Sequence, residues 1–279
     1  MVLAPKKDGG IRFCTDYRGL NKVTIKDVYP LPLISETLDQ LGKAKFFTLM
    51  DARAGYWQVK MKEEDIPKTA FATHRGLWEW ICMPFGLTNA PATFQRMMNM
   101  VLHGLTWRFC LVYVDDIMVY SATFEEHLEH IQQVLDRLRA HNIRLHPGKC
   151  HFCQKETGYL GHVISADGVQ VDHKKTDTIR TLKAPRSMKE LRGFLGMTGY
   201  YRRFIDRYAE IALPLTNLLK AVKDGVIRQW SPAAQQAFET LKVKLCEAPI
   251  LRYPDFGRSF CLYTDASRTA IAGGVDSKG

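Results

Sequence analysis

Hydrophobic residues in this chain gather in short runs that predict strands, and two of these runs meet acids. Residues 44–51 follow a buried-strand pattern that finishes at Asp51. A second apolar run, over residues 109–120, is interrupted by the adjacent acids Asp115 and Asp116. We expect this second run to form two strands that fold back on each other about the acidic pair.

The spacing of apolar residues elsewhere predicts amphipathic helices with clear starts. Asn89 is followed by Ala and Pro, and because Asn caps helices and Pro fits their first turn, we expect a helix to begin there. Thr123 and Glu126 have the spacing of a capping box before a longer helix. Its apolar face is expected to consist of Phe124, Leu128, Ile131, Leu135 and Leu138. His127 and His130 are expected to face solvent.

Turn residues divide the rest of the chain. A Gly-Gly turn within residues 6–17 and Gly76 within residues 68–83 each predict a hairpin. Residues 172–222 are basic and helical in pattern, and residues 260–265 begin a new strand. A length of 279 residues favours two or three subdomains over one compact unit.

The charge balance narrows the range of partners. The chain has 39 Lys and Arg against 29 Asp and Glu, which gives a formal net charge of +10. Such an excess attracts polyanions such as nucleic acids, although a basic protein without a nucleic-acid role has the same balance. No segment reaches the roughly 18 apolar residues that cross a membrane, so no membrane partner is expected.

The cysteines and residues 1–10 indicate where in the cell the protein is expected. The seven cysteines are scattered and odd in number, and residues 1–10 lack the apolar core of a secretory signal. We therefore expect reduced thiols and an intracellular location, in a cytoplasmic particle or the nucleus. Cys150 and Cys153 invite a zinc interpretation, but His162 follows at the wrong spacing for a zinc finger, so zinc is not expected.

The sharpest chemical feature is the acidic pair within an apolar run. Burying charged carboxylates costs several kcal/mol per ion unless a cation compensates, and Mg²⁺ prefers carboxylate oxygen. An Asp-Asp turn at an exposed hairpin tip is the competing interpretation. If the strand that ends at Asp51 lies beside Asp115 and Asp116, three carboxylates converge and suit two metal ions in phosphoryl transfer.

Six segments, in order, resemble the characteristic boxes of reverse transcriptases from gypsy-class LTR retrotransposons. The segment Tyr113-Val114-Asp115-Asp116 is similar to their Tyr-x-Asp-Asp box. The other segments are 16–22, 51–58, 83–91, 159–162, and 191–196 together with 200–204. Together they cover nearly the whole chain, so the resemblance is far more specific than any single box.

The resemblance implies a right-hand polymerase of the α+β class, with fingers, a palm built on an antiparallel sheet, and a helical thumb. It places fingers and palm at residues 1–170, the thumb at 171–228, and a connector with an incomplete ribonuclease H-like domain at 229–279. The implied function is RNA-directed and DNA-directed DNA polymerase. Its partners would be an RNA or DNA template with a primer and deoxynucleoside triphosphates, and its cofactor two Mg²⁺ ions, with Mn²⁺ as a substitute. The oligomeric state does not follow from the sequence.

The resemblance also assigns roles to individual residues. Asp51, Asp115 and Asp116 are expected to bind the metal ions and to be catalytic. The nucleotide-binding residues are expected to be Lys6, Lys7, Arg12, Tyr56, Phe85 and Gly86, with Tyr56 as a steric gate against ribonucleotides. Template or primer contacts are expected from Gln95, Tyr113, Tyr159, Leu160, Gly161, His162, Arg202 and Arg203.

Both ends of the chain differ from the family pattern. Asp265 resembles the first acid of ribonuclease H, but one carboxylate cannot hold two metal ions, so RNA cleavage by this chain is not expected. The fingers also look shortened before residue 6. Two other functions therefore stay open: a catalytically inactive Pol fragment that at most binds nucleic acid, and a different two-metal enzyme such as a nuclease.

Overall fold

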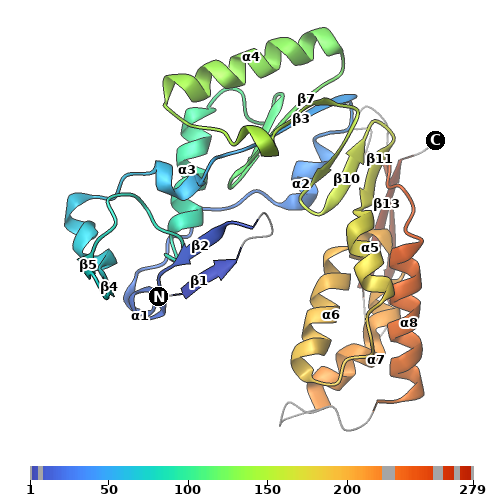
Figure 1. The fold of residues 1–279 in the computed structure, drawn as a ribbon. Helices are drawn as coiled ribbons and strands as arrows, with labels where there is room; N and C mark the ends of the chain where they lie inside the picture. The colour runs from blue at the N-terminus through green and yellow to red at the C-terminus, as the bar shows by residue number, and fades with distance from the viewer. Residues whose placement is uncertain (1, 6–8, 222–229, 254–259, 267–270, 278–279) are drawn as a thin grey trace. The chain divides into compact units, whose positions relative to one another are not determined.

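The computed structural model describes residues 2–5, 9–221, 230–253, 260–266 and 271–277 (Figure 1). Lys6 and Lys7 lie outside the described residues, and of Arg12 only the backbone is described. The chain divides into two compact units, residues 1–157 and 158–279.

The first unit consists of short strands and helices around one four-stranded sheet. Its strands are β1 (Val2–Pro5), β2 (Ile11–Cys14), β3 (Phe46–Asp51), β4 (Phe71–Thr73), β5 (Gly76–Trp78), β6 (Cys110–Tyr113), β7 (Asp116–Ser121) and β8 (His151–Gln154). Its α-helices are α1 (Arg18–Val23), α2 (Ile34–Asp39), α3 (Ala90–Val101) and α4 (Phe124–Ala140). Its 3₁₀ helices are η1 (Gly55–Gln58), η2 (Glu63–Thr69) and η3 (Pro147–Lys149).

The central sheet has the order β6-β7-β3-β8, with antiparallel neighbours. Three of its strands, β3, β6 and β7, come from the two apolar runs predicted from the sequence, and the second run does fold back on itself; the fourth strand, β8, was not predicted. Phe94 and Met98 of α3 and Ile131 and Val134 of α4 pack in one buried cluster with side chains of β6 and β7. The helix predicted to follow Asn89 is confirmed as α3.

Helix α4 begins with the predicted capping box, but its buried face differs from the prediction. The buried residues are His127, Ile131, Val134 and Leu138. Phe124 and Leu128 are instead 42% and 49% exposed. His127, expected in solvent, is fully buried because its ring nitrogens find partners in the sheet: Thr48 Oγ1 at 2.8 Å and Ser121 Oγ at 2.9 Å.

Both predicted hairpins are present. Strands β1 and β2 pair with each other, so the first hairpin begins at Val2, ahead of the residues that predicted it. Strands β4 and β5 pair about the turn before Gly76. The two hairpins meet through aromatic rings, because Phe13 of β2 lies 5.3 Å from Phe71 and 5.9 Å from Trp80 between ring centroids.

The second unit combines two small sheets, one of three strands and one of two, with a set of helices. Its strands are β9 (Glu156–Tyr159, which starts at the boundary), β10 (His162–Ser165), β11 (Gly168–Val171), β12 (Phe260–Ala266) and β13 (Ile271–Ser277). Its helices are α5 (His173–Arg180), α6 (Met188–Tyr200), the 3₁₀ helix η4 (Arg202–Phe204), α7 (Tyr208–Ala221) and α8 (Pro232–Cys246). The described part of the predicted basic helical region, residues 172–221, consists of helices and the short connections between them. Phe194 of α6 packs on Phe238 of α8 with ring centroids 4.6 Å apart.

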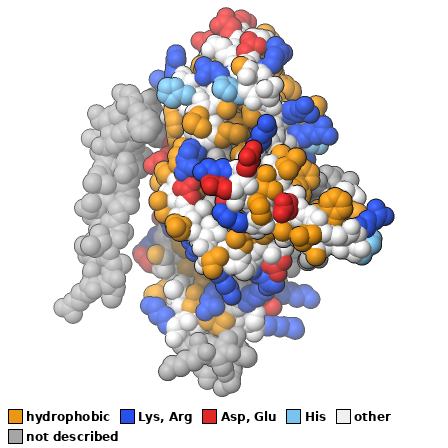
Figure 2. All heavy atoms as spheres, turned by 90° about the vertical axis from the view of Figure 1, so that its left-hand side faces the viewer, with side chains coloured by type: hydrophobic (Ala, Val, Ile, Leu, Met, Phe, Trp, Pro, Cys, Tyr) orange, Lys and Arg blue, Asp and Glu red, His pale blue; other side chains and the backbone are white. Residues whose placement is uncertain are grey.

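Two observations concern the ends of the chain and its surface. Asp265 lies on β12, opposite Ala272 of β13, and its side chain is outside the described part. Within the described residues, no helix has the length and apolar character that crossing a membrane requires. Figure 2 shows Lys and Arg side chains spread over the visible face, with hydrophobic side chains between them.

Candidate active site

The antiparallel register of β3 and β7 brings the predicted acids together. Asp51, the last residue of β3, lies opposite Asp116, the first residue of β7. Tyr113 and Asp116 close the β6–β7 hairpin, so Val114 and Asp115 form its two-residue turn. The Ala52 N–H donates to the Asp115 carbonyl at 3.0 Å, which joins this turn to the end of β3.

The electrostatics of these acids are unfavourable without a cation. Burial, followed by the charges of Asp51 and Asp116, raises the pKa of Asp115 to about 6. Burial and the charge of Asp51 also raise the pKa of Asp116. Lys149 partly offsets both effects, and its Nζ lies 3.9 Å from Asp51 Oδ2. The carboxylates therefore lie where additional positive charge is favourable.

The donor set fits a hard divalent cation. Asp115 Oδ1 is buried, and no described residue donates a hydrogen bond to it. Carboxylate oxygen is the ligand type that Mg²⁺ and Mn²⁺ prefer. Among the described residues, no group of three or more His, Cys, Asp or Glu side chains is positioned to hold a metal ion, so the fit concerns the type of ligand and not a completed coordination site.

A strained turn presents Asp115, and a buried glutamine holds that turn. Val114 has φ 51°, a conformation that is unfavourable for a β-branched residue. Its N–H donates to Gln95 Oε1 at 2.7 Å. Gln95 Nε2 donates to the carbonyl of Val112 at 3.1 Å and to Asn99 Oδ1 at 3.0 Å. Gln95 is fully buried, so the structure supports the acidic turn with this side chain and does not expose it toward a template.

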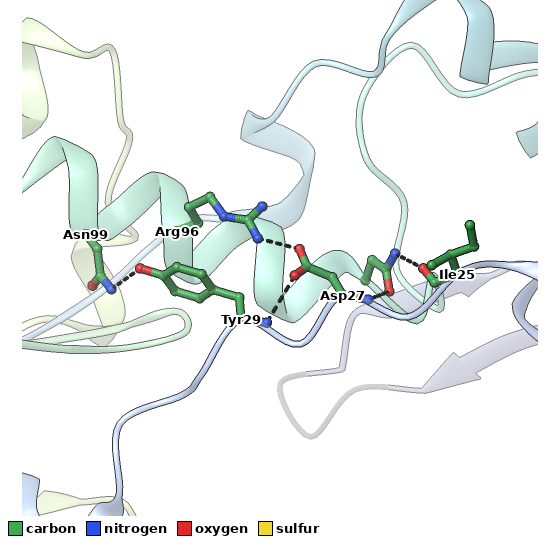
Figure 3. A network of polar contacts seen from close by, with 6 residues as sticks. Ile25, Asp27, Tyr29, Arg96 and Asn99 are labelled. Atoms are coloured by element: carbon green, nitrogen blue, oxygen red, sulfur yellow. Dashed lines mark hydrogen bonds and ion pairs between the residues drawn. The ribbon is translucent and has the colours of Figure 1, made fainter.

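A polar network fastens helix α3 to an extended segment before it (Figure 3). Asn99 Nδ2 donates to the Tyr29 hydroxyl at 2.8 Å, and Arg96 Nη2 donates to Asp27 Oδ2 at 2.6 Å. This hydrogen bond lowers the pKa of Asp27. The Arg96 guanidinium also lies 4.8 Å from the centroid of the Tyr29 ring. Asn89 bonds to the backbone of the same segment, at residues 25 and 27.

Gly55 is required by close approach to the acids. A Cβ at this position would overlap Asp115 Oδ1 and press on the Phe94 ring. Ala54 before it has φ 51°, so the chain turns sharply as it passes the carboxylate. No role was predicted for Gly55, because nothing in the neighbouring sequence indicates that Asp115 lies against it.

A cleft of about 420 Å³ opens beside the acids. It is lined by Ile11, Phe13, Asp51, Ala52, Arg53, Ala54, Gly55, Trp57, Phe85, Asp115, His146 and Lys149. The predicted Phe85 is part of this wall, and Arg12 follows Ile11 on β2. Arg53, Trp57, His146 and Lys149 were not predicted. They are single residues on loops and short turns, where spacing carries no signal of a site.

Tyr56 lies next to the cleft wall. Its ring centroid is 5.0 Å from that of Phe85 and 5.7 Å from that of Phe94. The ring is half-buried, and burial together with the charge of Asp115 raises the pKa of its hydroxyl. Gly86 is exposed, and its carbonyl accepts a hydrogen bond from Asn21 Nδ2 at 2.8 Å.

In the second unit, the residues expected at the primer form the β9–β10 turn. Tyr159 and His162 flank this turn and are each 2% exposed, so the turn residues Leu160 and Gly161 are more accessible than their neighbours. Burial lowers the pKa of His162. Arg202 and Arg203 are exposed on η4.

Comparisons with known proteins identify the family of this chain. The family model described as reverse transcriptase (RNA-dependent DNA polymerase) matches residues 4–164. A second model, an RNase H-like domain found in reverse transcriptase, matches residues 230–277. Because the first model covers more than half of the chain, this protein belongs to the reverse transcriptase family.

The relatives are polyproteins of transposons. The chain is 46% identical to the retrovirus-related Pol polyprotein from transposon 297 of Drosophila melanogaster, over 96% of this chain and 25% of that protein. It is 43% identical to the Pol polyprotein from transposon opus, over 96% of this chain and 28% of that protein. It is 36% identical to the transposon Tf2-3 polyprotein of Schizosaccharomyces pombe, over 100% of this chain and 21% of that protein. The chain thus spans about a quarter of these relatives.

Solved structures confirm the expected right-hand polymerase fold. The foamy viral protease-reverse transcriptase dRH in complex with double-stranded DNA matches with a TM-score of 0.87 and 26% identity, over 95% of this chain and 46% of that one. The foamy viral protease-reverse transcriptase in complex with an RNA/DNA hybrid matches with a TM-score of 0.83 and 25% identity, over 99% of this chain and 39% of that one.

Proposed function

We propose that this chain is the RNA-directed and DNA-directed DNA polymerase segment of a gypsy-class LTR retrotransposon Pol polyprotein. One observation carries the proposal. The β3–β7 register brings Asp51 opposite Asp116 and beside the Asp115 turn, within a chain of the reverse transcriptase family. In this proposal the chain works inside the cell, in a cytoplasmic particle or the nucleus.

Asp51, Asp115 and Asp116 would hold two Mg²⁺ ions, or Mn²⁺ in their place. When bound, these ions lower the pKa of the primer 3′ hydroxyl and neutralise the leaving pyrophosphate. Asp115 Oδ1 is buried and has no hydrogen-bond partner among the described residues, which supports a metal ion as its partner. Lys149, 3.9 Å from Asp51, supplies fixed positive charge at the same edge of the cleft.

The cleft wall would select and orient the incoming nucleotide. Tyr56 and Phe85 form a packed aromatic pair beside Asp115. A ring at Tyr56 would collide with a 2′ hydroxyl, so the site would favour deoxynucleotides. Arg12 on β2 would bind the triphosphate together with Lys6 or Lys7, because guanidinium and ammonium groups bind phosphate oxygens.

The proposed partner is an RNA or DNA template annealed to a primer. Two structurally similar reverse transcriptases were solved with double-stranded DNA and with an RNA/DNA hybrid, which supports a duplex partner. The net charge of +10 favours a polyanion. Arg202, Arg203 and the Leu160–Gly161 turn would contact the primer strand.

The test is primer extension on an RNA template with deoxynucleotides and Mg²⁺. We expect the wild-type chain to lengthen the primer and Asp115→Asn to abolish extension. Asp136→Asn is the matched control, because Asp136 is an exposed acid on α4 and should leave extension intact. A folded wild-type chain that binds the duplex without extending it would favour an inactive fragment, and shortened products would favour a nuclease.

A further inference from the structure

We propose that Tyr200 and Tyr201 are positioning residues that fasten the Leu160–Gly161 turn to the end of helix α6. The turn and the helix then hold a primer–template duplex as one body. This inference rests on the proposed function, in which the turn contacts the primer. It gives a role to Tyr200 and Tyr201, which are not among the residues predicted to contact template or primer.

The turn needs support from outside the hairpin. Leu160 and Gly161 connect β9 to β10 with φ angles of 47° and 76°. Positive φ at both central residues suits the twist of a two-residue hairpin, but only glycine adopts it readily. Leu160 is strained in this conformation, and such strain persists only where the surroundings fix it.

The two tyrosine hydroxyls supply that support. Tyr200 OH donates to the Leu160 carbonyl at 2.5 Å, and Tyr201 OH donates to the Gly161 carbonyl at 2.8 Å. Each donor lies 40 residues after its acceptor, at the last turn of α6. Both carbonyls of the turn are thus held by one helix end, so the turn cannot change conformation without breaking these bonds.

The rings around the turn are closely packed. His162 lies 5.3 Å from both Tyr200 and Tyr201 and 5.7 Å from Phe204, between ring centroids. Its Nδ1 lies 3.0 Å from the Leu160 carbonyl, which can only accept, so this nitrogen carries the proton. Tyr201 is 4% exposed. Removing a hydroxyl while keeping the ring therefore leaves this packing in place.

The fastened turn lies next in sequence to exposed cationic groups. Tyr200 is 41% exposed, and Arg202 and Arg203 follow it on the surface of η4. Arginines on such a surface bind phosphate oxygens and fix the register of a nucleic acid. A duplex held by these arginines would meet the turn at a fixed distance, because the two hydroxyl bonds set that distance.

The experiment removes only the hydroxyls, in Tyr200→Phe, Tyr201→Phe and the double variant of the full chain. Tyr208→Phe is the matched control. Its hydroxyl bonds to α6 itself, at Thr198 Oγ1 (2.9 Å) and the Leu195 carbonyl (3.3 Å), and not to the carbonyls of Leu160 and Gly161. Three quantities are measured: the dissociation rate of a labelled primer–template duplex, the extension rate of bound duplex in a single turnover, and amide exchange of the β9–β10 hairpin without nucleic acid.

We expect each turn variant to release the duplex roughly three- to tenfold faster, as the loss of one neutral hydrogen bond predicts. Hairpin amides should exchange faster by a similar factor, while Tyr208→Phe should change neither the release of the duplex nor the exchange of these amides. Exchange and release equal to those of Tyr208→Phe would overturn the inference. If the wild-type chain binds duplex but never extends it, the polymerase proposal fails, whereas release and exchange still decide the role of the tyrosines.

Discussion

Gln95 Oε1 accepts the N–H of Val114 at 2.7 Å, and this contact joins helix α3 to the turn that presents Asp115. Val114 is held at φ 51°, and Gln95 is fully buried with its amide nitrogen bonded as well. Because a buried polar group that loses its partner costs free energy, the pair is sensitive to change on either side.

Gln95→Met should therefore loosen the acidic turn. It removes three hydrogen bonds and leaves the Val114 N–H, the Val112 carbonyl and Asn99 Oδ1 without these partners. We expect a loss of about 2 kcal/mol in the free energy of unfolding and at least a tenfold fall in primer extension. Urea denaturation and single-turnover extension measure the two effects.

Val101→Ala is the control for this change, since Val101 is a buried residue on the same helix. It should lower stability without a matching fall in extension by the remaining folded protein. Combining Gln95→Met with Val114→Gly should recover part of the loss, because glycine adopts positive φ without strain. Equal effects of Gln95→Met and Val101→Ala on extension would contradict a specific role for Gln95.

Asp115→Asn should stabilise the fold when no divalent cation is present. The pKa of Asp115 is raised to about 6, so the folded state favours the protonated carboxyl and loses stability as pH rises from 3.8 through 6. At pH 7.5 in EDTA we expect the variant to gain about 1–2 kcal/mol, allowing for partial exposure.

Thermal unfolding with and without Mg²⁺ measures this gain. Mg²⁺ should raise the melting temperature of the wild-type chain more than that of the variant, since binding stabilises only the protein that holds the ion. Asp136→Asn, an exposed acid, should show neither effect. A variant less stable than wild type in EDTA would refute the predicted charge repulsion.

His127 should make the fold sensitive to mild acid. Burial, and to a smaller extent His130, lowers the pKa of His127 to about 4. The folded state therefore resists protonation, so stability is complete above pH 6.5 and falls as pH drops toward 4. The loss attributable to this residue is at most about 3 kcal/mol.

His127→Gln keeps a polar side chain that does not titrate, so the fall in stability between pH 6.5 and 4.5 should become shallower. Urea midpoints at several pH values test this expectation. His74→Gln, a change at an exposed histidine beside the β4–β5 turn, should leave the pH profile as it is in wild type. An unchanged profile in His127→Gln would assign the acid sensitivity to other groups.

Gly55→Ala should impair catalysis through geometry alone. The added methyl group would overlap Asp115 Oδ1, so either the chain or the carboxylate must move. A displacement of about 1 Å in a catalytic group costs roughly 100-fold in rate. We expect that loss in single-turnover extension, measured beside Gly19→Ala. A Cβ at Gly19 meets nothing within 4 Å, so extension near the wild-type level in Gly55→Ala would contradict the contact.

The sequence alone determined the elements whose signals are local. The apolar runs gave β3, β6 and β7, the capping box gave the start of α4, and the acids at the ends of those runs gave Asp51, Asp115 and Asp116 as candidates. These features depend on the periodicity of burial and on backbone groups a few residues apart, and both can be read along the chain.

Only the tertiary structure decided how these elements meet. The strand register set Asp51 opposite Asp116. Thr48 and Ser121 of the sheet form hydrogen bonds with His127, so α4 buries His127 and leaves Phe124 exposed. Gln95 became a support of the acidic turn, and Tyr200 and Tyr201 bonded to carbonyls 40 residues earlier. A hydrogen bond between residues far apart in sequence depends on where the backbone places both partners. The local pattern of hydrophobic and polar positions does not determine that placement.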